Sequence, residues 1–160
     1  MAFDQTKVRA AIVAEALTWE MTPYHPHARI KGVGVDCAQL PIAIYSAVGA
    51  VPKDYAPSYS QEWMNHRDEE LYLDEIRRFA REIQEGELKP GDLVVWKFGR
   101  TYSHSAVVIE APIVIHAVLK GGFVLRADID RDSDMELPTR PRRCFTVFAK
   151  RSGFVAKARA

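Results

Sequence analysis

The sequence predicts an α+β domain whose N-terminal helices pack against one face of a five-stranded antiparallel sheet. Apolar residues recur at helical spacing up to about residue 83, whereas short runs after residue 89 read as strands separated by tight turns. A chain of 160 residues suits one domain with its own core. We therefore expect a single domain over residues 1–151, followed by a flexible tail over residues 152–160.

The first and third predicted helices are amphipathic. Asp4 is placed to cap a helix that runs to about Met21. The segment RDEELYLDEIRRFAREI, residues 67–83, has apolar residues on one side and charged residues elsewhere. Each helix should therefore bury one side, and the charges of the third helix most simply form a solvated surface.

The second predicted helix follows Cys37. Asp36 is expected to be its N-cap, and Gly49 its C-terminal stop. Pro41 lacks a backbone N–H, so it should bend the first turn or delay the start of the helix.

The second half of the chain contains five predicted strands separated by turn residues. They cover residues 93–98, 103–110, 113–119, 123–129 and 143–150.

Composition excludes several classes of function. With 22 basic and 21 acidic side chains the net charge is +1, so nucleic acid is not an expected partner. The first 21 residues are too polar for a secretory signal peptide, and no apolar run approaches the roughly 18 residues of a membrane span. We expect a chain that is made in the cytoplasm, does not insert into a membrane and reaches any target beyond it with the help of another machine.

The two cysteines are expected to be free thiols with different roles. Cys37 falls at the start of a predicted helix, where unpaired backbone N–H groups and the helix dipole favour the thiolate. Cys144 leads a strand and is expected to be a core thiol. Cys37 taken alone fits a small buried residue as well as a nucleophile, and a nearby base would decide between them.

His104 and His116 are the candidate bases. Each alternates with apolar residues, and their even separation of 12 places them on one face if their strands form a hairpin. A hairpin centred near Glu110 with a three- or five-residue loop would place them directly opposite one another. Either histidine alone fits a structural role. Together with Cys37 they match a nucleophile, a base and a group that orients the base.

The order of these motifs resembles the NlpC family of cell-wall cysteine peptidases. The resemblance runs from about Thr22 to Val118 and includes the Asp-Cys pair, GDLV at residues 91–94 and the two histidines. The stretch TPYHPHARIKGVGVDC is similar to the version in phage tail-associated cell-wall peptidases. The resemblance implies a compact papain-like fold and hydrolysis of a peptidoglycan stem peptide between D-glutamate and a diamino acid. It implies no cofactor, and it makes phage tail proteins candidate partners and the virion tail a candidate location.

The resemblance also assigns roles to individual residues. Cys37 matches the nucleophile, His104 the base, His116 the third polar residue and Tyr24 a tyrosine near the oxyanion site. The expected substrate-binding residues are Asp36, which could instead cap the helix, together with Ser103 and His27.

The chain departs from the family pattern at two places. It has DCAQL where DCSGL is usual, and HSAVV where HVGI is common. Ser105 is a mild change, whereas Ala38, Gln39 and Pro41 together bear on substrate preference and activity. Two alternatives therefore stay open. One is an inactive phage tail-assembly protein with the same fold, and the other is an amidase or acyltransferase that uses the same Cys-His-His trio.

The remaining histidines give weaker signals. His25 and His27 form a His-Pro-His triplet, but two ligands without a third do not predict a metal site. His66 is most simply a surface residue.

Overall fold

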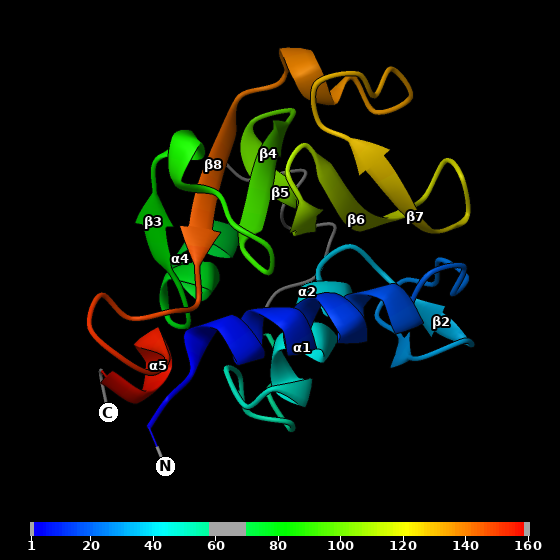
Figure 1. Cartoon of the computed structure of the whole chain (residues 1–160). Helices are drawn as coiled ribbons and strands as arrows, with labels where there is room; N and C mark the ends of the chain where they lie inside the picture. Colours follow the sequence, from blue (N-terminus) through cyan, green and yellow to red (C-terminus); the bar gives the residue numbers. More distant parts are fainter. Residues whose placement is uncertain (1, 58–69, 159–160) are drawn as a thin grey trace.

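The computed structural model describes residues 2–57 and 70–158, and it confirms the α+β class. A six-stranded antiparallel sheet has the strand order β3-β8-β4-β5-β6-β7. Helices α1 and α2 lie together on one side of this sheet, and the segment 129–141 lies on the other (Figure 1).

The elements follow one another in a simple order. The helices are α1 (Gln5–Thr18), α2 (Gln39–Ala47), α4 (Leu71–Arg77) and α5 (Val155–Ala158), with short 3₁₀ turns at Glu85–Glu87 and Leu137–Thr139. The strands of the main sheet are β3 (Arg81–Ile83), β4 (Leu93–Phe98), β5 (Thr101–Glu110), β6 (Ile113–Val118), β7 (Phe123–Asp128) and β8 (Arg142–Thr146). A separate two-stranded ribbon is formed by β1 (Arg29–Ile30) and β2 (Gly34–Val35).

Helix α1 begins as predicted and ends early. The Asp4 carboxylate accepts a hydrogen bond from the Lys7 backbone N–H at 3.2 Å, which is the expected cap. The helix stops at Thr18, because the N–H of Met21 donates to the carbonyl of Val124 in β7 at 2.8 Å. The end of α1 is therefore tied to the sheet.

The third predicted helix is wrong in its second half. Helix α4 ends at Arg77, and residues Arg81–Ile83 form strand β3 instead. These residues pair with Cys144 to Thr146 of β8, so the exposed edge of β8 gains backbone hydrogen bonds that a longer helix would not provide. The sheet consequently has six strands rather than five. Residues 67–69 of this prediction lie outside the described residues.

The C-terminal segment differs from the expected flexible tail. Phe154 and Val155 are buried, and the N–H of Val155 donates to the carbonyl of Val147 at 2.8 Å. The Phe154 ring meets the Phe3 ring edge-on at 5.3 Å. Burial of the Phe154 and Val155 side chains therefore holds this segment against the rest of the domain.

The β5–β6 hairpin places His104 and His116 on one face, as predicted, but with a different loop length and strand register. Val107 pairs with Ile115, so His104 and His116 are diagonal neighbours rather than directly opposed. The connecting loop has two residues, an even number that alone would break the shared face. A bulge at Ile109 adds one unpaired residue and restores the alignment.

The sheet separates two groups of buried side chains. The helix-side core joins the inner sides of the helices to one sheet face and includes Ile12, Leu40, Ile44, Tyr72, Val95, Val107, Ile115 and Cys37. The far-side core lies under the segment 129–141 and includes Val94, Trp96, Ala106, Val108, Val114, Ile129, Leu137 and Cys144.

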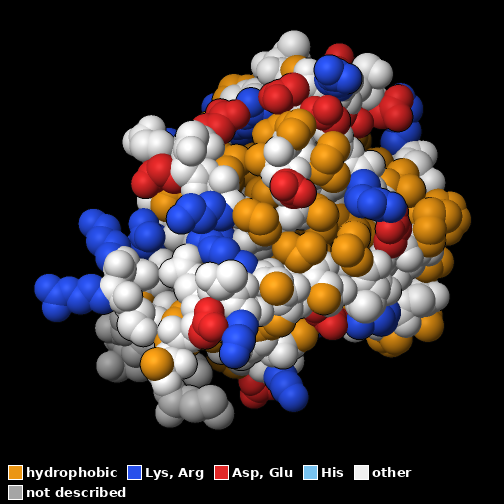
Figure 2. Space-filling view, in the orientation of Figure 1, with side chains coloured by type: hydrophobic (Ala, Val, Ile, Leu, Met, Phe, Trp, Pro, Cys, Tyr) orange, Lys and Arg blue, Asp and Glu red, His pale blue; other side chains and the backbone are white. Residues whose placement is uncertain are grey.

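The surface in Figure 2 is mixed. Hydrophobic side chains gather over the middle of this face, and charged side chains line its top, where the segment 129–141 lies. Over residues 2–57 and 70–158, no helix combines the length and the apolar character needed to cross a membrane.

Candidate active site

Cys37 lies at the mouth of α2, and its side chain is 8% exposed. One carboxylate oxygen of Asp36 accepts hydrogen bonds from the backbone N–H groups of Ala38 and Gln39, at 3.0 and 2.8 Å. The backbone carbonyl of Asp36 accepts a hydrogen bond from the Leu40 N–H at 3.0 Å. Asp36 thus caps this turn as expected, although the regular helix starts only at Gln39. Pro41 falls in the first turn of the regular helix, where a backbone N–H has no intrahelical partner to lose.

The second carboxylate oxygen of Asp36 holds the preceding loop. It accepts the backbone N–H of His27 at 2.7 Å, and His27 has a left-handed backbone with φ of 63°. Asp36 is 2% exposed, so three backbone N–H groups surround a buried carboxylate. The His27 ring is exposed, and its backbone rather than its ring contacts the Cys37 loop.

Two hydroxyl groups that the sequence did not assign to the site lie beside Cys37. The Cys37 carbonyl accepts a hydrogen bond from the Ser105 hydroxyl at 3.1 Å, and the Ser105 oxygen is hydrogen-bonded to the Tyr72 hydroxyl. The Cys37 sulfur lies 3.9 Å from the Ser103 carbonyl oxygen. Ser105 occupies a position where the family pattern has an apolar residue, and this departure is the feature of the sequence that could have predicted a polar contact here.

The two histidines form a buried pair. Nε2 of His104 lies 2.8 Å from Nδ1 of His116, at hydrogen-bond distance. His104 is 6% exposed and His116 is 1% exposed. The His104 ring also meets the rings of Trp96 and Phe98, with centroids 6.1 and 5.4 Å away.

Burial keeps both histidines neutral near pH 7. It lowers the pKa of His104 well below its usual value, and His116 and Arg140 lower that pKa further. Burial also lowers the pKa of His116 to about 4, against the opposing effect of Asp132. Neutral imidazole is the form that can accept a proton from a thiol.

The thiol and the histidine pair occupy different sides of strand β5. Cys37 belongs to the helix-side core, whereas His104 shares its strand face with Ala106 of the far-side core. The pairing of β4 with β5 has a β-bulge in which Ser103 of β5 is the extra residue, next to His104 in the strand.

Tyr24 is held beside the segment that leads to Cys37. It forms an isolated bridge with Val35, and its N–H donates to the carbonyl of Gly122 at 2.7 Å. The Tyr24 side chain is half-buried against the helix-side core. The Tyr24 backbone therefore connects the β6–β7 turn to strand β2, which leads to Cys37.

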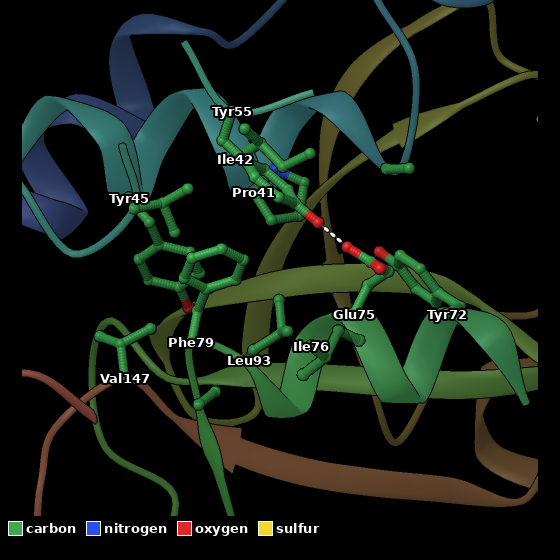
Figure 3. A pocket seen from close by; sticks show the side chains of 13 residues that line it. Pro41, Ile42, Tyr45, Tyr55, Tyr72, Glu75, Ile76, Phe79, Leu93 and Val147 are labelled. Atoms are coloured by element: carbon green, nitrogen blue, oxygen red, sulfur yellow. Dashed lines mark hydrogen bonds between the residues drawn. The ribbon is translucent and has the colours of Figure 1, made fainter. Parts of the chain in front are cut away.

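Two cavities lie near these groups. A small pocket of about 50 Å³ lies between α2 and α4, and the Tyr55 hydroxyl donates a hydrogen bond to Glu75 in its wall (Figure 3). Ala38, the neighbour of Cys37, lines this cavity together with Tyr72. On the far side, a cavity of about 250 Å³ has more polar walls, formed in part by His116, Lys120, Arg126, Asp132 and Asp134.

The remaining candidates are structural or peripheral. Cys144 is buried, and its burial raises its pKa to about 12, so the core-thiol expectation is confirmed. His25 is exposed, and its Nδ1 lies 3.0 Å from the Pro26 carbonyl. Among the described residues, no three His, Cys, Asp or Glu side chains converge as a metal site. His66 lies outside the described residues.

Comparison with solved structures gives the same fold. The NlpC/p60 domain of the peptidoglycan hydrolase SagA superposes with a TM-score of 0.55 at 20% identity, covering 84% of this chain and 96% of that domain. NlpC2 from Trichomonas vaginalis gives 0.62 at 15% identity over 89% of this chain, which spans only 46% of that protein. RipD from Mycobacterium tuberculosis, described as a non-catalytic NlpC/p60 domain protein adapted to peptidoglycan binding, gives 0.56 at 12% identity and covers 88% and 98%.

Sequence comparison identifies the family. No curated protein sequence gives a significant match. The profile of the NlpC/P60 family matches residues 21–134, which is well over half of the chain and contains Cys37, His104 and His116. The chain belongs to the NlpC/P60 family.

Proposed function

We propose that this protein is a cysteine peptidase that hydrolyses an amide bond in peptidoglycan stem peptides, between D-glutamate and a diamino acid. The observation that carries the proposal is the 2.8 Å contact between neutral His104 and His116, across β5 from a thiol at the capped N-terminal end of α2. Membership of the NlpC/P60 family and the fold shared with the SagA hydrolase domain support it.

The chemistry assigns one role to each group. The Cys37 thiolate attacks the amide carbon, and the Cys37 backbone N–H holds the oxyanion with help from the Tyr24 hydroxyl. His104 takes the thiol proton and passes it to the leaving amine, after which water releases the thioester. His116 engages Nε2 of His104, which leaves Nδ1 for the thiol.

The proposed reaction requires Cys37 and His104 to meet across the start of β5. The bulge at Ser103 of β5 is the place where the strand can change the direction of a side chain. Catalytic hydrogen bonds are often long in unliganded enzymes and shorten when substrate binds.

A second candidate is a peptidoglycan-binding protein without catalysis. The buried sulfur, on the opposite side of β5 from the histidines, favours it. RipD is an example of the fold in a protein described as non-catalytic.

Digestion of purified cell wall separates the two candidates. We expect the full chain to release stem-peptide fragments with a new amino terminus, identified by mass spectrometry. Cys37→Ala should abolish this release and Cys144→Ala should preserve it. Equal release by Cys37→Ala would contradict the peptidase, and wall binding without any release would favour the second candidate. Products that are deamidated or transferred rather than cleaved would indicate the amidase or acyltransferase alternative.

We also propose delivery to the wall by a phage tail, in the virion. The similarity of residues 22–37 to phage tail-associated peptidases supports this proposal. Co-purification of the chain with assembled tails is expected, and its absence from intact virions would contradict the proposal.

A further inference from the structure

Ser105 is an unusual polar residue in the middle of a buried strand. It is 0% exposed and belongs to the strand face that packs against the helices. The family pattern has an apolar side chain at this position, which needs no partner. A buried hydroxyl is costly unless both its proton and its lone pairs are satisfied, so the partners of Ser105 need an explanation.

The proton inventory fixes the direction of the hydrogen bonds. The single Ser105 proton is donated to the Cys37 carbonyl at 3.1 Å. The contact between Tyr72 and Ser105 must therefore have Tyr72 as the donor. Burial raises the pKa of Tyr72 well above its usual value, with Cys37 as the next cause, so this hydroxyl keeps its proton. The result is one directed chain from Tyr72 through Ser105 to Cys37.

We propose that Tyr72 and Ser105 are positioning residues for the nucleophile, which fix the Cys37 peptide plane from helix α4. The Ala38 N–H on the other side of this plane is already bound to Asp36, at 3.0 Å. With the carbonyl and the following N–H both held, the first turn of α2 cannot rotate. The sulfur therefore stays at the N-terminal end of α2, where the helix dipole favours its charged form.

The structure provides a matched control for this proposal. Tyr45 is another buried tyrosine beside the same cavity, and its hydroxyl donates to the Gly91 carbonyl at 2.9 Å. Tyr45→Phe removes a buried tyrosine hydrogen bond without touching the Cys37 peptide. Besides Tyr72, Asp36 is a titratable group next to Cys37, and His104 lies across β5.

The test is the pH profile of Cys37 alkylation by iodoacetamide, measured by mass spectrometry in full-length protein with Cys144→Ala in the background. Ser105→Ala should raise the midpoint of the profile and slow alkylation at pH 7 by about threefold to tenfold, the value of one hydrogen bond. Tyr72→Phe should have a smaller effect in the same direction. Ser105→Thr, which keeps the hydroxyl, and Tyr45→Phe should both behave as the parent protein does.

Two results would overturn the proposal. One is a Ser105→Ala midpoint equal to that of Tyr45→Phe, and the other is a Cys37 in the parent protein that does not react at any pH. If Ser105→Ala does not fold, the pair Tyr72→Phe and Tyr45→Phe makes the same comparison.

The inference rests on the proposed function only for its effect on turnover, because alkylation needs no wall substrate. A shifted alkylation profile without wall hydrolysis would refute the peptidase and leave the positioning role intact. Wall hydrolysis that requires Cys37 but has the same kcat in the Ser105→Ala variant would refute the positioning role alone. Where both hold, kcat should fall and KM should stay constant.

Discussion

The two sides of strand β5 differ in how they hold their polar residues. On the helix side, the Cys37 peptide is held by neutral hydroxyls and a capping carboxylate, all paired with backbone groups or with each other. On the far side, His104 packs against the rings of Trp96 and Phe98, and burial keeps both His104 and His116 neutral. The comparison shows that position is set by local hydrogen bonds on one side and protonation by desolvation on the other. The proposed chemistry needs both sides.

The largest expected effect is on the far side. His104→Gln keeps a polar side chain next to His116 but cannot take a proton from a thiol, so turnover of wall peptides should fall by about 10² to 10⁴-fold. The matched change in an exposed histidine, His25→Gln, should leave turnover unchanged. Comparable rates for the two variants would show that the buried pair is not the base.

Stability should depend on pH because of the same pair. The folded-state pKa of His116, about 4, lies below its value of about 6.5 in an unfolded chain, so the unfolded state binds more protons between these values. This contribution is fully present above pH 6.5 and is lost as the pH falls towards 4, by about 3 kcal/mol. His104 acts in the same direction.

Urea unfolding at a series of pH values measures this dependence. His116→Gln should flatten the curve between pH 6.5 and 4, whereas His25→Gln should not. A wild-type free energy of unfolding that stays constant over this range would contradict the neutral buried pair.

On the helix side of β5, loss of the Asp36 cap should lower the free energy of unfolding. Asp36→Ala leaves three buried N–H groups without their acceptor and should cost about 2 to 4 kcal/mol of stability. The half-exposed cap of α1 offers the comparison, because Asp4→Ala should cost only about 1 kcal/mol. Equal losses in denaturant unfolding would mean that Asp36 does not have this special role.

The smallest expected effect concerns the loop before Cys37. A Cβ added at Gly34 would lie 2.8 Å from Cβ of His25, so Gly34→Ala should cost about 1 to 3 kcal/mol through a shift of the backbone. At Gly86 an added Cβ meets nothing within 4 Å, and Gly86→Ala should change stability by less than about 1 kcal/mol. Thermal unfolding of both variants checks this contrast, and a Gly34→Ala variant as stable as Gly86→Ala would show that the close approach does not matter.

Local patterns predicted most of the fold. Helical spacing and alternation located α1, α2 and strands β4 to β8, because each pattern reflects which side of an element is buried. Strand β3 was missed, since the sequence FAREI, residues 79–83, continues a helical pattern and only the free edge of β8 makes Arg81–Ile83 a strand. The buried C-terminal segment was missed for a similar reason, because its partner Phe3 lies at the other end of the sequence.

The sequence predicted which residues of the candidate site share a face of the sheet, but not how the two sides of the sheet are arranged. The even spacing correctly paired His104 with His116, although the loop and bulge differ from those assumed. Alternation could not show on which side of β5 the helix with Cys37 would pack. Nor could it show that Tyr72, 35 positions along the chain from Cys37, would reach the same peptide through Ser105.

The central claim is that the thiol on one side of β5 and the histidine pair on the other act together. The most direct measurement is the pH profile of Cys37 alkylation in the Cys144→Ala protein, with and without His104→Gln. The account predicts that His104→Gln slows alkylation at pH 7 by about tenfold or more and moves the midpoint upward, because the thiolate loses its base. Superimposable profiles would show that Cys37 and His104 do not communicate, and would contradict the proposed peptidase.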